Sequence, residues 1–313
     1  MKFVIFGAGT MGALVGALLT KAGEEVILVD KSDKVIAAIR QNGVKVTLKN
    51  TEEAFRIPIV KNAAEIKEKP DVILFLVKGL YTEAAAKEAQ ILTGPDTYVL
   101  TVQNGVGNAD ILAQYYDNAH VLHGILEFAG KLIEPGVVVA MISENSVITF
   151  GPINNVLTPE MNEIGAVFAQ TGIKVMVKEN VDGDIWVKMR NNMANALMGV
   201  VRLTIGQAME VDVTDDLLKK VRNECIQVAE AKGVKFSEEN LKVLNKKAAF
   251  NAELAAHLPS TAQDMKNHLL TEIEFLNGAV YHEGQKLGIP TPYNETLYKL
   301  VRIIERSYDQ QFA

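Results

Sequence analysis

The feature that most constrains the fold is a glycine pattern near the start of the chain, directly after an apolar run. Lys2 to Phe6 is typical of a short strand, and Gly7-Ala8-Gly9-Thr10-Met11-Gly12 follows it. In a G-x-G-x-x-G segment the first glycine permits a tight turn, the second lets a pyrophosphate approach the backbone, and the third allows close helix packing. The phosphate would lie at the N-terminus of the following helix. The pattern therefore predicts a strand–turn–helix unit that binds a dinucleotide.

An acidic residue stands where such a unit needs one. Asp30 ends the apolar run that begins at Val26, eighteen residues after Gly12. At the end of a second strand, a carboxylate accepts hydrogen bonds from the adenosine ribose hydroxyls. A glycine pattern alone is commonly just a turn or a linker, but here strand, helix and acid follow in the required order. We expect Gly7 to Gly12 and Asp30 to bind the cofactor.

Length and composition bound the architecture. At 313 residues the chain exceeds the usual size of one core, so two domains are expected. Hydrophobic residues make up 48% of the chain, which is enough for sizeable cores and excludes disorder. The formal net charge of -6, without any run of Lys and Arg, argues against a nucleic-acid surface.

The single cysteine and the N-terminal stretch bear on the compartment. Cys225 has no partner for an internal disulfide, as expected in a reducing cytosol. Its alternative role is that of a small buried hydrophobic residue on a helix. The apolar stretch from Phe3 to Thr20 has the composition of a signal peptide, but glycines at the fingerprint positions interrupt it. We expect a soluble, cytoplasmic protein without a membrane span.

Residues 1–178 alternate strand-like and helix-like segments, which predicts a Rossmann-type α/β domain with a mainly parallel sheet. Strands are expected at Phe3–Phe6, Val26–Asp30, Val72–Val77 and Tyr98–Val102, and helices at Thr10–Ala22 and Asp33–Asn42. Later strands near Val137–Met141, Val147–Phe150 and Lys174–Val177 have more polar neighbours, which favours antiparallel additions.

From about Asn180 the pattern changes to long helical periodicity. It is interrupted near Gly206, Gly233, Pro259 and Gly288. Residues 179–313 are therefore predicted to form an all-helical domain, with substrate expected between the two halves of the chain.

One helical segment carries a polar stripe. Lys188, Asn192 and Asn195 are spaced i, i+4, i+7, which places them on one helical face among apolar neighbours. A substrate could satisfy such a stripe. The alternative is a solvated lysine beside structural asparagines, although asparagine is unfavourable inside a helix.

A second segment follows Pro259. Ser260 with Gln263, and Thr271 with Glu274, each fit a capping box, so two helix starts are expected and Glu272 falls in a first turn. Ser260 and Glu272 are thus either site residues or a simple cap and a carboxylate favoured by the helix dipole.

Two polar residues follow strands at the edge where open parallel sheets bind ligands. Lys78 comes after Leu76-Val77 and Asn104 after Val102-Gln103, although a residue in such a place is often only a loop starter. The histidines have no metal-ligand spacing, so no metal site is assigned to His120, His123, His257, His268 or His282. The sequence has neither a nucleophile elbow nor a P-loop, which disfavours hydrolases and phosphotransferases.

Together these segments resemble the ketopantoate reductase family over essentially the whole chain. The shared marks are Gly7 to Gly12, Val77-Lys78, Gln103 to Gly107, Trp186-Val187-Lys188 with Asn192, the Ser260 segment and Thr271 to Gly278. The resemblance implies an NAD(P)-dependent oxidoreductase acting on a CH–OH group of a small 2-keto acid or 2-hydroxy acid. It also implies a helical C-terminal domain like that of 6-phosphogluconate dehydrogenase, and a homodimer.

The resemblance further assigns roles to individual residues. Lys188 would protonate the carbonyl oxygen while hydride leaves the nicotinamide, and Glu272 would support the lysine and the substrate. Positioning of substrate and cofactor falls to Asn104, Asn192 and Ser260, with Lys78 on the cofactor side. A lysine ammonium suits this chemistry because it stabilises a developing alkoxide, and desolvation lowers its pKa.

Two departures from the family pattern bear on specificity. Asp30 stands where NADPH-using members commonly have a basic residue, and a carboxylate repels a 2′-phosphate by roughly 4 kcal/mol per unit charge at about 4 Å in an effective dielectric near 20. NADH is thus expected, whereas Lys31 and Lys34 favour NADP. Leu203-Thr204-Ile205-Gly206-Gln207 replaces a Pro-Asn-Gly-Glu type segment, so an apolar Ile205 stands in place of an amide.

Both departures resemble the NAD-dependent D-2-hydroxyacid dehydrogenases of this family, including D-mandelate dehydrogenase. An enzyme for C3-branched or aromatic 2-keto acids is therefore the first hypothesis. The alternative is a 2-dehydropantoate 2-reductase that makes pantoate with NADPH. A third hypothesis, from another class, is a nucleotide-binding sensor without turnover.

Overall fold

Two units divide the chain, and the structure, a computed structural model, describes residues 1–245, 255–256 and 258–311. The first, here called the α/β unit, comprises Met1–Gln103 and Asn108–Val181. The second, the helical unit, comprises Asn104–Gly107 and Asp182–Ala313. Residues 104–107 thus leave the α/β unit and belong to the helical one.

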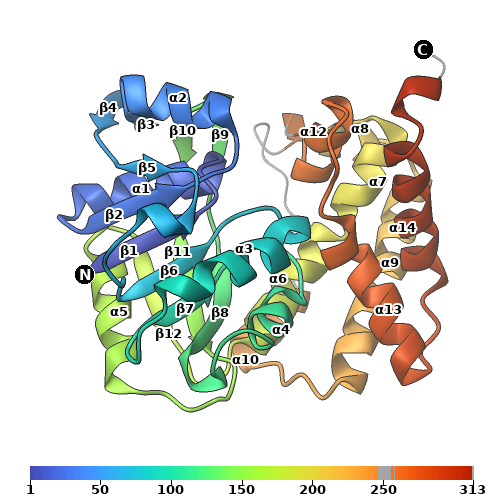
Figure 1. The fold of residues 1–313 in the computed structure, drawn as a ribbon. Coiled ribbons are helices and arrows are strands. Elements are labelled where there is room, and N and C mark those ends of the chain that lie inside the picture. Colours follow the sequence, from blue (N-terminus) through green and yellow to red (C-terminus); the bar gives the residue numbers. More distant parts are fainter. Residues whose placement is uncertain (246–254, 257, 312–313) are drawn as a thin grey trace. The chain divides into compact units, whose positions relative to one another are not determined.

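The α/β unit is built on an eight-stranded sheet of order β12-β11-β8-β7-β6-β1-β2-β5 (Figure 1). Its strands are β1 Lys2–Phe6, β2 Glu25–Val29, β5 Ile59–Val60, β6 Val72–Phe75, β7 Tyr98–Thr101, β8 Val121–Leu126, β11 Val147–Pro152 and β12 Lys174–Val177. From β5 to β8 every neighbouring pair is parallel, and the chain order reverses between β1 and β6. This is the doubly wound order of dinucleotide-binding domains, whose ligands bind at the carboxyl ends of the strands beside that reversal.

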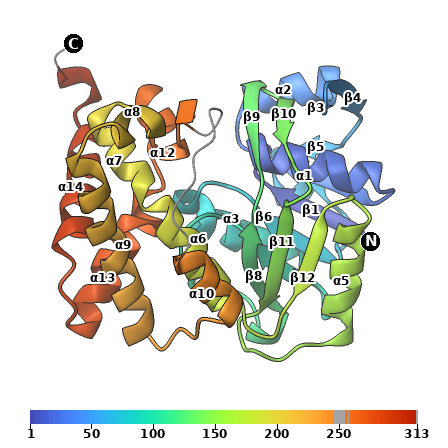
Figure 2. The same cartoon turned by 180° about the vertical axis from the view of Figure 1, so that it is seen from behind.

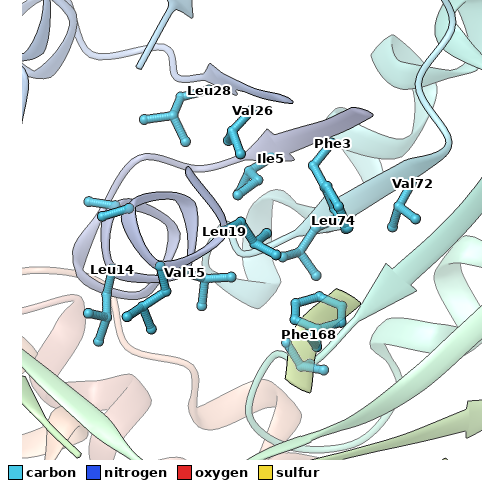
Figure 3. Packing of buried hydrophobic residues seen from close by; sticks show 14 of the residues in the cluster. Phe3, Ile5, Leu14, Val15, Leu19, Val26, Leu28, Val72, Leu74 and Phe168 are labelled. Atoms are coloured by element: carbon cyan, nitrogen blue, oxygen red, sulfur yellow. The ribbon is translucent and has the colours of Figure 1, made fainter. Parts of the chain in front are cut away.

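Helices cover both faces of this sheet. They are α1 Thr10–Lys21, α2 Asp33–Asn42, α3 Thr82–Ala89, α4 Asn108–Leu112 and α5 Pro159–Ala169. Alternate strand residues enter different cores, as a period of two requires: Phe3 and Ile5 pack with α1 and α5, while Val4 and Phe6 pack with α3. Figure 3 shows Phe3 and Ile5 among side chains of α1, with Phe168 of α5 beside Phe3.

Several predicted elements are confirmed at their bounds or within a few residues. Helix α2, strand β12 and strand β10, Val137–Met141, have the predicted limits, whereas β6 ends at Phe75 rather than Val77. The expected antiparallel addition is confirmed for β11, which runs antiparallel to β8. Strand β12 pairs parallel with β11, so it runs opposite to the strands from β5 to β8. The strand at Val137–Met141 is not part of this sheet.

A smaller sheet was not predicted. It has the order β4-β3-β10-β9, with bounds β3 Val44–Leu48, β4 Thr51–Phe55, β9 Ala129–Glu134 and β10 Val137–Met141 (Figure 2). Its β10 pairs antiparallel with β9 but parallel with β3, which is far away in sequence. Strand β10 itself was predicted, but the pairing of strands over such separations leaves little local pattern, so only the tertiary structure reveals this sheet.

The helical unit has α-helices and 3₁₀ turns as its regular elements in the part of the chain that the structure describes. Its helices are α6 Asp182–Asn192, α7 Ala194–Val201, α8 Ile205–Met209, α9 Val213–Ala231, α10 Glu238–Asn245, α12 Ser260–Lys266, α13 Asn277–Leu287 and α14 Pro292–Glu305. Its core gathers Trp186, Met189, Met193 and Cys225 with residues of the later helices. The predicted fold class, an α/β Rossmann-type domain followed by a helical domain, is confirmed.

Candidate functional site

The turn after β1 is held by backbone contacts that only glycine allows. The Gly7 N–H donates to the carbonyl of Val29 at 2.8 Å, and its φ of +99° lies in the left-handed region. A Cβ on Gly7 would lie 2.7 Å from the backbone nitrogen of Val77, and a Cβ on Gly12 only 1.7 Å from the Gly7 carbonyl oxygen. The turn, β6 and the start of α1 are therefore packed backbone against backbone.

Gly9 differs from these two glycines because open space surrounds it. A Cβ built there meets nothing within 4 Å, and Gly9 is the N-cap of α1 without any side-chain cap. The N–H groups of a first helical turn have no partners inside the helix, and α1 has no acidic residue there. A pyrophosphate fits here because there is space around Gly9, the first-turn N–H groups of α1 can donate to it, and the N-terminal end of the helix dipole is positive.

Asp30 lies directly after β2 and is partly buried. Its Oδ2 accepts the Ala8 N–H at 2.7 Å, and its Oδ1 accepts the Ser32 N–H at 2.9 Å. These bonds fix the carboxylate beside the glycine turn. A carboxylate oxygen accepts more than one hydrogen bond, so Asp30 can also receive ribose hydroxyls. The Gly7–Gly12 turn and Asp30 thus fit an adenine dinucleotide.

The two lysines that follow Asp30 lie in different settings. The ammonium of Lys31 is bonded to the carbonyl of Lys61 at 2.8 Å and forms an ion pair with Glu88 at 2.7 Å. Lys34 is exposed in the first turn of α2.

Lys78 lies at the same sheet edge, and a neighbouring side chain holds its loop. Lys78 is the N-cap of the 3₁₀ turn η2, Gly79–Tyr81, and its carbonyl accepts the Tyr81 N–H at 2.8 Å. The Nε2 of Gln103 donates to the Val77 carbonyl at 2.6 Å and to Thr82 Oγ1 at 2.9 Å.

Gln103 is buried, so its amide ties the loop after β7 to the loop after β6. Gln103 belongs to the Gln103–Gly107 motif, but no role for it was predicted from the sequence. A long polar side chain directly after a buried strand was the available indication, because a buried amide needs partners.

In the helical unit, Lys188 and Asn192 share one face of α6, four residues apart. Asn195 lies on the next helix, α7, because the chain departs from α-helical bonding at Met193. There the Met193 N–H bonds weakly to the Arg190 carbonyl, at 3.4 Å and three residues back. The single helix expected over 188–195 is therefore interrupted at Met193, between α6 and α7.

Neither expected capping box after Pro259 forms. Ser260 is the first residue of α12, an exposed position preceded by Pro259 as N-cap without a side-chain bond. Gln263 donates instead to the carbonyl of Leu258 at 2.7 Å. The expectation of a Ser260 cap is wrong because Ser260 already has a place inside the helix, where a hydroxyl cannot receive the first-turn N–H groups.

The second expected box, at Thr271, also has a tertiary explanation. Both the N–H and the hydroxyl of Thr271 donate to Oε1 of Glu305 at 2.7 Å. Glu272 is the N-cap of a short 3₁₀ turn, η5 Ile273–Phe275, rather than part of an α-helical first turn. Glu305 is buried and was not singled out from the sequence, since no local pattern links it to Thr271.

The Asn104 loop joins this turn. The Val106 N–H donates to the Phe275 carbonyl at 3.0 Å, and a Cβ on Gly105 would lie 2.0 Å from the same oxygen. Gly105 has a φ of +83°. The structure therefore brings the segments of Asn104 and Glu272 together within the helical unit, and Gly105 is required for their close approach.

The candidate residues thus fall into two groups by unit. The α/β unit carries Gly7, Ala8, Gly9, Thr10, Met11, Gly12, Asp30, Lys31 and Lys78, and the helical unit carries Asn104, Lys188, Asn192, Asn195, Ser260 and Glu272.

Two other ionisable side chains of the helical unit, Cys225 and Arg190, are affected by burial. Cys225 is fully buried on α9, and burial raises the pKa of its thiol, so this thiol is unreactive. Burial lowers the pKa of the Arg190 guanidinium, which lies on α6 near Cys225. No group of three or more His, Cys, Asp and Glu side chains lies close enough to hold a metal within 1–245, 255–256 and 258–311; His257 is outside the described residues. No described helix has the length and apolar character to cross a membrane.

Comparisons with known proteins match both units. The family model "Ketopantoate reductase PanE/ApbA" matches residues 3–155, and the model of its C-terminal domain matches residues 180–305. The chain is 30% identical over 308 residues to the 2-dehydropantoate 2-reductase of Streptococcus pyogenes, covering 97% of this chain and 98% of that one. It is likewise 30% identical over 314 residues to the 2-dehydropantoate 2-reductase of Aquifex aeolicus, covering 97% of each.

Solved structures show the same similarity. A ternary structure of D-mandelate dehydrogenase with NADH and anilino(oxo)acetate has a TM-score of 0.91 at 26% identity, covering 99% of this chain and 100% of that one. A PanE/ApbA family ketopantoate reductase from Ralstonia eutropha has a TM-score of 0.87 at 31% identity, with the same coverage.

Proposed function

The chain belongs to the ketopantoate reductase PanE/ApbA family, and from that premise we propose that it is a 2-dehydropantoate 2-reductase. It is an NAD(P)-dependent oxidoreductase acting on a CH–OH group. Asp30 and residues 203–207 depart from the family pattern and favour a D-2-hydroxyacid dehydrogenase, which is the first hypothesis from the sequence. The curated relatives, however, are named 2-dehydropantoate 2-reductase, and this chain matches them over nearly their whole length. The reductase therefore takes precedence here.

In this proposal each unit contributes one part of the chemistry. The bound cofactor supplies a hydride to the ketone carbon. Lys188 donates a proton to the carbonyl oxygen, so that hydride and proton together convert the ketone to the alcohol. Its ammonium also stabilises the negative charge that develops on that oxygen. The observation that carries the proposal is that one chain has both a glycine turn open at Gly9, in the α/β unit, and Lys188 with Asn192 on α6 of the helical unit.

Other residues position the reactants. Glu272 supports Lys188 and the substrate, and the substrate and cofactor are bound by Asn104, Asn192, Asn195, Ser260 and Lys78. We assign residues 1–178 to the nucleotide-binding domain and 179–313 to a substrate and dimerisation domain. A cytoplasmic homodimer completes the proposal.

We propose NADH as the preferred cofactor. The carboxylate of Asp30 is fixed beside the glycine turn by two backbone N–H groups, which suits the free ribose hydroxyls of NADH and repels the 2′-phosphate of NADPH. NADP binding through Lys31 is the alternative.

A second candidate function rests on residues 203–207. Thr204 and Gln207 form a reciprocal capping box at the start of α8, at 3.0 and 3.3 Å, so their polar groups bond to backbone. Ile205 packs against the helical core. A site with few free polar groups discriminates poorly for a substrate hydroxyl. This observation favours an NAD-dependent D-2-hydroxyacid dehydrogenase acting on C3-branched or aromatic 2-keto acids.

Steady-state rates decide between these functions. Ketopantoate, 2-ketoisocaproate and benzoylformate are each assayed with NADH and with NADPH. The proposal expects the highest kcat/KM for ketopantoate with NADH. A preference for benzoylformate or 2-ketoisocaproate would establish the second candidate instead.

The Lys188→Ala variant tests the assignment of the acid. We expect kcat to fall by about 100-fold or more, the usual contribution of general acid catalysis. NADH affinity, measured by calorimetry, should stay within about twofold of the parent because Lys188 acts on the substrate. Normal turnover by this variant would refute the assignment. A parent protein that binds NADH but reduces none of the keto acids would be a sensor.

A further inference from the structure

All three N–H donors of the Lys31 ammonium are used inside the α/β unit. Lys31 Nζ lies 2.8 Å from the Lys61 carbonyl oxygen and 3.1 Å from Asn62 Oδ1. The Glu88 carboxylate is the third acceptor, with its Oε2 at 2.7 Å. An ammonium has three donors and no acceptor, so a further anion would have to replace one of these partners.

Glu88 is the charged member of this set and is itself well anchored. It lies in the last turn of α3, and its Oε1 also accepts the Ala63 N–H at 2.8 Å. Its side chain is 24% exposed, against 57% for Lys31. A carboxylate near a helix C-terminus is disfavoured by the helix dipole, so the cation of Lys31 and the Ala63 N–H offset that cost.

The position of Lys31 gives this ion pair a consequence for the ligand. Lys31 directly follows Asp30, at the carboxyl end of β2, where the adenosine ribose is bound in this fold. A basic side chain next to that ribose attracts a 2′-phosphate, as an arginine does in NADP-binding domains. In this chain the cation at that place is turned to Glu88 on α3.

We propose that Glu88 is a positioning residue that sets the cofactor preference, by holding Lys31 away from the 2′ position of the adenosine ribose. The inference deepens the proposed function and rests on its dinucleotide site. Asp30 repels a 2′-phosphate directly. Glu88 acts through Lys31, by occupying a nearby cation that would otherwise offset part of that repulsion.

The variant Glu88→Gln tests this. It removes the charge but keeps an oxygen for the Ala63 N–H, so the fold should persist, which a thermal melt verifies. Calorimetry then gives Kd for NADH, NADPH, ADP and adenosine 2′,5′-bisphosphate. We expect affinity for the two 2′-phosphorylated ligands to rise about fivefold, the scale of one partly exposed ion pair, and affinity for NADH and ADP to stay unchanged.

Two further variants separate this effect from a general change of charge. Glu83→Gln removes the same charge from the same helix, where Glu83 pairs with Lys87 rather than Lys31, and should leave all four affinities unchanged. Adding Lys31→Ala to the Glu88→Gln background should abolish the gain, and comparison with the two single variants gives the coupling of the pair.

The outcomes are distinct. If Glu88→Gln leaves the ratio of NADPH to NADH affinity unchanged, or if the gain survives Lys31→Ala, the inference is overturned while the proposed function stands. If the parent protein binds neither NADH nor NADPH, the proposed function and this inference both fail.

Discussion

At the scale of single residues, the glycine turn contains two glycines with opposite surroundings. A Cβ on Gly12 would meet the Gly7 carbonyl oxygen at 1.7 Å, whereas a Cβ on Gly9 meets nothing within 4 Å. Gly12 is thus required by the fold of the chain itself. At Gly9 the protein itself has room for a side chain, so we attribute the glycine to a ligand that approaches the backbone there.

This contrast predicts different results for two alanine substitutions. Gly12→Ala should destabilise the protein by about 3 kcal/mol, because backbone must move away from the new methyl group. Gly9→Ala should leave the free energy of unfolding within about 0.5 kcal/mol but weaken NADH binding by about tenfold or more, since the methyl occupies the phosphate's space. Urea unfolding and calorimetry measure the two quantities. Unchanged NADH affinity in Gly9→Ala would place the pyrophosphate elsewhere.

At the scale of elements, the turn that carries Glu272 is positioned by the far end of another helix. Glu305 closes α14, with Oε1 accepting both donors of Thr271 and Oε2 accepting Arg302 Nη1 at 2.9 Å. Its side chain is 1% exposed. Because Thr271 directly precedes Glu272, the carboxylate of Glu305 fixes the backbone position of Glu272 at the start of the turn.

Glu305→Ala should therefore affect both stability and turnover. Leaving the Thr271 N–H without a partner costs about 1–3 kcal/mol. We also expect kcat to fall about tenfold with an unchanged KM for NADH, because a small displacement of a positioned group slows the chemistry. Glu305→Gln keeps an acceptor oxygen and should recover part of kcat. Glu295→Gln, an exposed site on the same helix, is the control. Lower stability with normal kcat would limit Glu305 to a structural role.

At the scale of the whole molecule, each unit has a tyrosine whose hydroxyl pKa is raised in the folded protein. Burial raises the pKa of Tyr308, in the helical unit, to about 12 from its ordinary value of 10.0. Burial also raises the pKa of Tyr116 in the α/β unit, whose hydroxyl donates to the Ala86 carbonyl at 2.7 Å. Alkaline pH is therefore expected to lower the stability of both units.

The sign of the effect follows from linkage. In the unfolded chain these tyrosines lose their hydroxyl protons at a lower pH than in the folded protein. Their contribution to the free energy of unfolding is therefore fully present below about pH 10 and is lost as the pH rises toward about 12. Urea unfolding at about pH 8 and about pH 11 measures the loss. Tyr308→Phe should make it smaller, whereas Tyr81→Phe, at a side chain 54% exposed, should not. An equal loss in the parent and Tyr308→Phe would contradict the prediction.

The sequence predicted well wherever the pattern is local. The strand–turn–helix at Gly7–Gly12, the placement of Asp30 and the limits of α2 all follow from residues close together in the chain. The change to helices after about residue 180 also follows from periodicity. It predicted poorly where a partner comes from elsewhere: the capping boxes at Ser260 and Thr271 were wrong, and the smaller sheet was missed.

The sequence by itself determined the dinucleotide turn and the order of elements, because glycine spacing and apolar periodicity are short-range properties. The tertiary structure decided which side chains these elements hold in place. Glu305 reaches Thr271, Gln103 reaches the Val77 carbonyl, and Glu88 reaches Lys31. Each of these bonds joins residues more than twenty positions apart, and a polar side chain's partner depends on packing that no local pattern encodes.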